Sequence, residues 1–132
     1  MRSIQTSASQ KIIFAHVASC GTLIIIENQL ETDMISILSL SGELISSMPV
    51  PRIKHIQARG SILVWVDEMN ELHIFDIELY VLFLFIWFNE QRTSLIHSEH
   101  LRFQVQSLWV VKSHPIKVVL QDSAHQLYFL HI

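Results

Sequence analysis

The stretch ILVWVDEMNELHIFDI (62–77) decides how this chain is expected to fold. It contains an apolar run, a short polar turn and a second apolar run. β-Branched and aromatic residues dominate both runs, as is typical of strands packed into a sheet. The stretch is therefore either a free-standing hairpin or one unit of a repeat.

The second half of this stretch has two relatives in the chain. LHIFDI (72–77) has the same order of apolar and polar residues as ISILSL (35–40) and LYFLHI (127–132). Self-similarity of this kind is the usual sign of a repeat architecture. We therefore compare the residues that precede each copy.

The first half of the stretch is repeated as well. LVWVD (63–67) matches LIIIE (23–27) and VVLQD (118–122). The same spacing separates this run from the next in the second and third copies, whereas the first copy has a longer connection, NQLETDM (28–34). The hairpin is therefore one unit of a repeat that occurs three times.

Further strands are expected on both sides of these hairpins. An apolar segment that ends in turn residues precedes each copy, namely KIIFAHVASCG (11–21), RIKHIQARG (52–60) and VQSLWVVKSHP (105–115). A fourth strand is expected after the first two copies, in ELISSM (43–48) and ELYVLFLFIWF (78–88). Several runs are apolar on both faces, which predicts a sheet stacked between two others.

These observations predict an all-β fold of consecutive antiparallel sheets. We expect one domain, residues 1–132, with approximate units 11–48, 52–90 and 101–132. A small β-sandwich or β-barrel is the alternative.

The pattern resembles the blades of WD-repeat β-propellers, in which a Trp-Asp pair lies near the end of the third strand. Phe75-Asp76 occupies that place in the segment 53–77, and Leu130-His131 and Leu38-Ser39 occupy it in the other copies. The resemblance is degenerate. No Gly-His pair precedes any copy, and EMNE (68–71) and SAHQ (123–126) replace the Asp-Gly turn. The Asp-His-Ser-Trp network of regular family members is therefore not carried over.

The resemblance implies a partial propeller of about three blades, of which the last lacks its outer strand. Propellers usually have about four to eight blades, and repeat units bury their faces only against neighbours. We therefore expect a fragment or short isoform of a larger propeller protein, or a chain that another chain completes.

Composition limits the function classes. Half of the residues are apolar and 16% are charged, with a net charge of −3, so no general nucleic-acid surface is expected. The single cysteine, Cys20, favours a reducing compartment. MRSIQTSASQK (1–11) lacks the apolar centre of a signal peptide. The expected location is intracellular, in cytoplasm or nucleus.

The apolar run LYVLFLFIWF (79–88) is the most unusual segment. We expect a strand buried on both faces or, as the functional alternative, a partner-binding strip carried by Tyr80, Phe83, Phe85 and Trp87. A membrane anchor is a further alternative, although a spanning helix needs about 20 apolar residues. An interfacial helix is disfavoured because polar residues do not segregate to one face.

No metal, cofactor or catalytic site is predicted. The eight histidines, including His97 and His100, show no zinc-binding spacing, and Cys20 is expected in a turn. Asp67, Asp122 and Glu27 share a repeat position, where an acid is expected to accept hydrogen bonds from the local backbone.

The only basic cluster, in PRIKHIQAR (51–59), is expected to be a solvated surface. The sequence therefore predicts a non-enzymatic protein–protein interaction or scaffold module, with loops such as 28–34 and 89–100 as docking sites and its protein partner unknown. A small membrane-associated protein anchored by 79–88 is the alternative.

Overall fold

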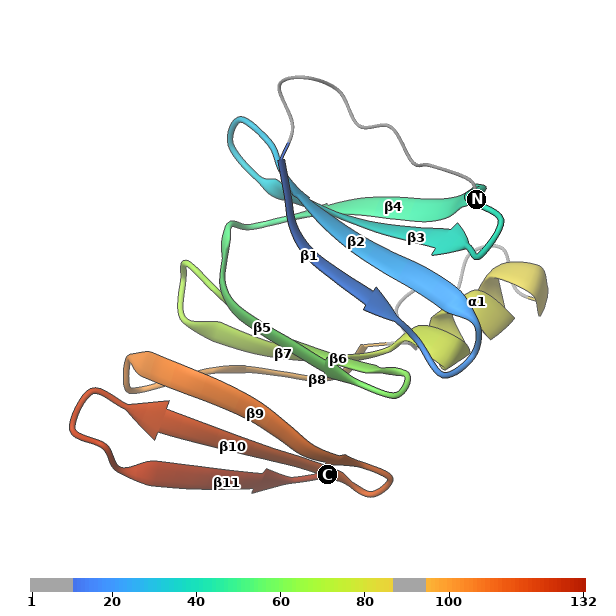
Figure 1. The fold of residues 1–132 in the computed structure, drawn as a ribbon. Coiled ribbons are helices and arrows are strands. Elements are labelled where there is room, and N and C mark those ends of the chain that lie inside the picture. Colours follow the sequence, from blue (N-terminus) through green and yellow to red (C-terminus); the bar gives the residue numbers. More distant parts are fainter. Residues whose placement is uncertain (1–10, 87–94) are drawn as a thin grey trace.

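The computed structural model describes residues 11–86 and 95–132, and the side chains of residues 11–81 and 97–132. In these ranges eleven strands form three consecutive antiparallel sheets, with one helix beside them (Figure 1). The prediction of an all-β fold with consecutive antiparallel sheets is confirmed.

The first sheet has four strands in the order β1-β2-β3-β4. They are β1 (Lys11–Val17), β2 (Thr22–Asn28), β3 (Asp33–Ser39) and β4 (Leu44–Val50). Each strand is antiparallel to its neighbour in sequence, so short turns connect all of them. The first copy of the repeat is therefore a complete meander.

The second sheet also has four strands, in the order β5-β6-β7-β8. They are β5 (Ile53–Arg59), β6 (Ile62–Asp67), β7 (Glu71–Asp76) and β8 (Leu95–His100). The expected fourth strand at 79–88 is wrong, because helix α1 (Ile77–Ile86) takes that place. The sheet is completed by β8, which lies beyond the predicted unit 52–90.

Asp76 explains why a helix begins where a strand was expected. Its Oδ1 accepts the backbone N–H of Leu79 at 3.1 Å, which satisfies one of the free amides of the first helical turn. Glu78, in the same turn, interacts favourably with the positive end of the helix dipole. The residue aligned with the aspartate of the Trp-Asp pair therefore serves here as a helix cap.

The third sheet has three strands in the order β9-β10-β11. They are β9 (Val105–Ser113), β10 (Ile116–Asp122) and β11 (Leu127–His131). β11 is therefore an edge strand, whereas its counterpart β7 lies inside the second sheet.

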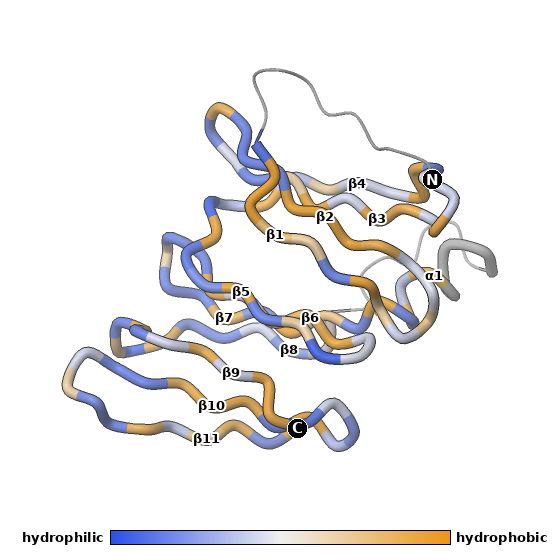
Figure 2. The backbone as a smooth tube through the Cα atoms, viewed as in Figure 1, coloured by the Kyte–Doolittle hydropathy of each residue, from blue (hydrophilic) through white to orange (hydrophobic). Residues whose placement is uncertain are grey.

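The second sheet lies between the other two (Figure 1). Side chains of β6 alternate, so that Leu63 and Trp65 pack toward the first sheet while Val64 and Val66 pack toward the third. We call the face toward the preceding sheet the front face and the face toward the following sheet the back face. Hydrophobic residues recur along strands of all three sheets (Figure 2).

The two interfaces differ in chemistry. Aromatic rings gather between the first and second sheets, where Phe75 lies 6.3 Å from Trp65 and 5.1 Å from Tyr80 between ring centroids. The buried core between the second and third sheets is aliphatic and includes Val64, Leu72, Leu108, Val118 and Leu120. Both faces of the second sheet are therefore covered, as the sequence predicted for a stacked sheet.

Candidate functional site

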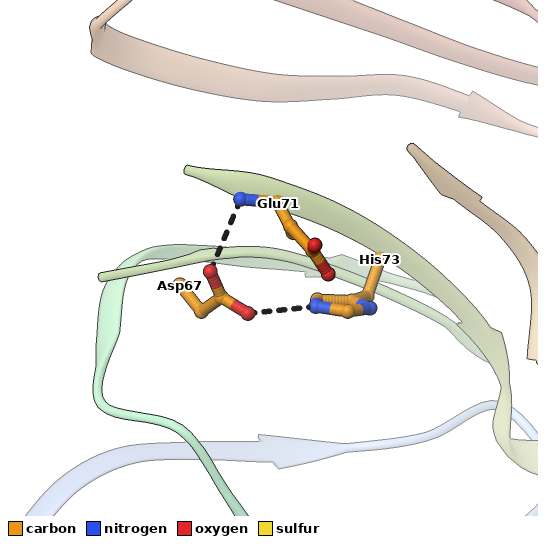
Figure 3. A group of neighbouring side chains, drawn as sticks. All are labelled: Asp67, Glu71 and His73. Atoms are coloured by element: carbon orange, nitrogen blue, oxygen red, sulfur yellow. Dashed lines mark hydrogen bonds and ion pairs between the residues drawn. The ribbon is translucent and has the colours of Figure 1, made fainter. Parts of the chain in front are cut away.

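A carboxylate organises the turn between β6 and β7 (Figure 3). Oδ1 of Asp67 accepts the backbone N–H groups of Met69 and Glu71 at 2.9 and 3.0 Å, and Oδ2 lies 2.9 Å from Nε2 of His73. Asn70 adopts a positive φ of 63° in this turn, which asparagine tolerates better than most residues. The expected turn-forming role of Asp67 is confirmed.

The turn between β10 and β11 repeats this arrangement. Oδ1 of Asp122 accepts the N–H groups of Ala124 and Gln126, both at 2.9 Å, and Oδ2 accepts the hydroxyl of Tyr128 at 2.9 Å. His125, at the position of Asn70, has a positive φ of 65°. The same hydrogen-bonding scheme therefore occurs at equivalent positions of two copies.

These hydrogen bonds change two pKa values. The amide of Gln126, followed by the hydroxyl of Tyr128 and the amide of Ala124, lowers the pKa of Asp122 below its ordinary value. The hydrogen bond to Asp122 in turn raises the pKa of Tyr128. The turn therefore favours an ionised aspartate and a neutral tyrosine.

Asp67, Glu71 and His73 are the one group in the described ranges whose ligand atoms lie close enough to hold a metal ion, within 4.8 Å of one another (Figure 3). Oδ1 of Asp67 is engaged by the turn amides and Oδ2 by His73, whose Nδ1 lies 3.2 Å from Oγ of Ser98. Gln126 and Tyr128 replace the other two potential ligands in the third copy while the turn is retained. The repeat therefore favours a structural role for the group.

The group extends into a short polar network. Ser98, His73 and Asp67 follow one another through hydrogen bonds, and the His73 ring stacks on Trp65 with centroids 5.0 Å apart. These are the residue types of the WD-repeat network, although β6, β7 and β8 supply them here. Sequence reasoning missed the network because Ser98 lies in a segment that was expected to be a loop.

Polar contacts also fix the first and second sheets to the segments that follow them. Arg52, which precedes β5, forms an ion pair of 3.0 Å with the buried Asp33 and donates to carbonyls of the β2–β3 turn. The expectation that this basic cluster is simply solvated is wrong for Arg52, whereas Lys54 and Arg59 are exposed.

Asn70 makes the corresponding connection after the second sheet. Its Nδ2 donates to the carbonyls of Leu101 and Phe103 at 2.9 and 2.6 Å, and its own carbonyl accepts the N–H of Leu101. In both copies the turn between the second and third strands therefore holds the segment that enters the next sheet.

The predicted partner-binding residues lie on α1 or beyond it. Tyr80 is buried, and its hydroxyl lies 2.6 Å from Oγ of Ser46 on β4. The side chains of Phe83 and Phe85, and all of Trp87, lie outside the described residues. A binding role for this segment stays a prediction, and the described ring of Tyr80 is occupied by internal contacts.

Other candidates are surface groups. Cys20 is exposed in the turn after β1, as expected. His97 pairs with Glu99 at 2.9 Å on β8, and His100 is exposed at the end of that strand. The expected docking loop 89–100 is therefore partly a strand, and its residues 89–94 lie outside the description.

Sequence reasoning also missed an apolar patch on the back face of the third sheet. Trp109 and Phe129 flank Val119 in one row across the sheet, and they are 45% and 66% exposed. Val111 and Leu127 extend the patch. Alternation along β9 and β11 could have indicated it, because these side chains alternate with buried ones in β9 and with partly buried ones in β11.

Comparison with known proteins assigns no family to this chain. No protein-family model matches this chain, and the search of curated proteins found no similar sequence.

In the described part of the chain, no helix combines the length and apolar character needed to cross a membrane.

Proposed function

We propose that this chain is a non-enzymatic protein-interaction module built from propeller-like sheets, and that it docks through the back face of its third sheet. The observation that carries this proposal is the exposure of apolar positions whose equivalents are buried in the second sheet. Leu72 and Ile74 of the second sheet are fully buried, whereas Leu127 and Phe129 at the same repeat positions are 48% and 66% exposed.

The equivalence between the back faces of the second and third sheets supports this proposal. Val64 and Val119 are aligned by the repeat, and both lie on back faces. The third sheet covers Val64, whereas Val119 lies between two exposed aromatic side chains. Patches of this kind are typical of interaction sites. The surface that fits is therefore the front face of another sheet of the same type.

A second copy of this chain can supply such a front face. Val17 and Leu23 are paired on the front face of the first sheet, and Leu23 is aligned with Leu63, which packs against the first sheet from the second. Val17 is 59% exposed. Ile25 and Leu38 on the same face are buried, so the exposed apolar part of the front face is its edge at Val17. Two copies head to tail would provide six sheets, within the usual range of about four to eight propeller blades.

The repeated turns support a propeller-like module rather than an enzyme. Asp67 and Asp122 use the same backbone contacts, and different side chains complete them. This variation is expected where the group stabilises a turn. The alternative membrane anchor gains no support from the described start of α1, because Ile77 and Tyr80 are buried against the sheets.

Sedimentation velocity over a range of protein concentrations tests the proposal. We expect the unmodified chain to self-associate, and the variants Phe129→Asp and Val17→Asp each to shift the equilibrium toward monomer. Leu30→Asp is the matched control, because Leu30 is 95% exposed in the β2–β3 turn, away from both faces.

Mixing Phe129→Asp with Val17→Asp tests whether the copies associate head to tail. In a head-to-tail complex, the intact front face of Phe129→Asp meets the intact back face of Val17→Asp, so the mixture regains association. A monomer at every concentration, or equal weakening by Leu30→Asp, would overturn the proposal.

A further inference from the structure

We propose that the free edge of β11 accepts one extended strand from a partner protein, which completes the third sheet. This inference rests on the proposed role as an interaction module but uses a sheet edge rather than a sheet face. The first two sheets have four strands and the third has three, so the added strand would take the place that β8 holds in the second sheet.

β11 is the one edge strand in the described ranges that lacks the usual protection against strand addition. Natural edge strands are blunted by bulges, charged residues or proline. Pairing of each other edge strand with its neighbour contains a register shift. Each of those strands also contains a charged residue or proline, namely Lys11, Pro49, Lys54, Glu99 and Lys112. The β10–β11 register is regular, and LYFLH contains none of these residues.

The backbone of β11 offers a continuous set of hydrogen-bonding groups at this edge. Ile132 donates to Ile116, and Asp122 donates to Gln126, so the even-numbered residues of β11 point their backbone groups toward β10. The N–H and C=O groups of Leu127, Phe129 and His131 therefore point away from β10. An extended peptide can pair with these three residues by β-augmentation.

A pocket lies beside this edge and gives the added strand a side-chain preference. Its volume is about 200 Å³, and its walls come from β8, the segment after it, β10 and β11. The lining residues are Glu99, Leu101, Phe103, Leu120, Tyr128, Phe129 and Leu130. Tyr128 and Leu130 pack toward the second sheet. We therefore infer that the partner strand places apolar side chains on that face.

The neighbouring second sheet prevents β11 of a second copy from serving as the added strand. Pairing of two β11 strands would form one continuous sheet with the second sheets of both copies on the same face. Each second sheet has one strand more than the third, and Glu99 of β8 lines the pocket beside β11. The two projecting β8 strands would therefore compete for the same space. A single extended segment meets no such obstacle.

Amide hydrogen exchange measured by NMR tests this inference, with a synthetic peptide of alternating valine and threonine as the probe. In the chain alone, we expect fast exchange at Leu127, Phe129 and His131 and slow exchange at Tyr128 and Leu130. Saturating peptide should slow exchange at the first three amides about tenfold or more. Intermolecular nuclear Overhauser effects should connect the peptide to β11.

Phe129→Pro and Phe129→Ala form the matched pair of variants. Both remove the ring, but only proline removes the N–H at the centre of the edge, so proline should weaken peptide binding about tenfold relative to alanine. His131→Pro and His131→Ala repeat the comparison if Phe129→Pro loses protection at Tyr128. Equal affinity of both pairs would overturn the inference.

These experiments also distinguish peptide binding at the β11 edge from self-association through the back face of the third sheet. Phe129→Ala is expected to lose self-association and to retain peptide binding, so each proposal can fail alone. Protection of the β11 edge in the chain without peptide, or protection of another edge strand by the peptide, would also overturn the inference.

Discussion

The second and third sheets follow the same plan but have different surroundings. Each contains a central hairpin whose turn is organised by an aspartate, Asp67 or Asp122, through two backbone amides. In the described ranges, the second sheet is covered on both faces and has a fourth strand, whereas the third has an exposed back face and an unpaired edge strand. The difference shows that local sequence defines the hairpin, and neighbouring sheets decide which of its faces are buried.

The largest difference between the two sheets is expected when a charged residue replaces the equivalent back-face valines, Val64 and Val119. Val64→Asp should lower the free energy of unfolding by more than about 4 kcal/mol, because it buries an unpaired carboxylate. Val119→Asp should lower it by about 1 kcal/mol in dilute protein, because water reaches that face. Chemical denaturation measures both values. Equal losses would show that the third sheet is covered as the second is.

The two turns provide a smaller effect. Asp67→Ala should lower the free energy of unfolding by about 2 kcal/mol, because it removes a buried carboxylate that accepts hydrogen bonds from two amides. Asp122→Ala should lower it less, because water can replace the lost contacts at an exposed turn. Thermal unfolding of both variants checks the order. A larger loss for Asp122→Ala than for Asp67→Ala would show that the two turns contribute differently to stability despite their matching geometry.

The smallest effect concerns pH. The lowered pKa of Asp122 means that its turn stabilises the protein above the ordinary aspartate pKa, and that this contribution is lost as pH falls through the lowered value. Denaturant titrations at a series of acidic pH values should show a smaller acid-induced loss for Asp122→Asn than for the unmodified chain. Superimposable pH profiles would contradict the assigned cause.

Much of the fold could be predicted from hydrophobic patterning. The run Leu63–Val66 is apolar at every position, and this correctly indicated a sheet covered on both faces. The helix after β7 was missed because its apolar side chains show no amphipathic spacing, and the local signals were limited to Asp76 and Glu78 at its start. β8 was missed because its polar sequence, LIHSEH, relies on pairing with β7.

The contacts between repeat units were harder to predict. Arg52 reaches the β2–β3 turn from a distant part of the sequence, and in the second copy Asn70 makes the corresponding contact with different chemical groups. The exposure of the back face of the third sheet likewise depends on what packs against it rather than on the residues of the face. Hydrophobic patterning predicts the strands of each repeat unit, but it does not predict the contacts between units.

Gly60 lies where turns of the three sheets approach one another. Its carbonyl accepts hydrogen bonds from the N–H of Ser19 and from His16, and a Cβ at this position would lie 3.4 Å from Oγ of Ser113. Turns from all three sheets therefore meet in one column at this end. A larger residue here would also be strained by the positive φ of 61°. A side chain longer than a methyl group would extend toward Ser19 and Ser113, so it would change the angle between the second sheet and its neighbours.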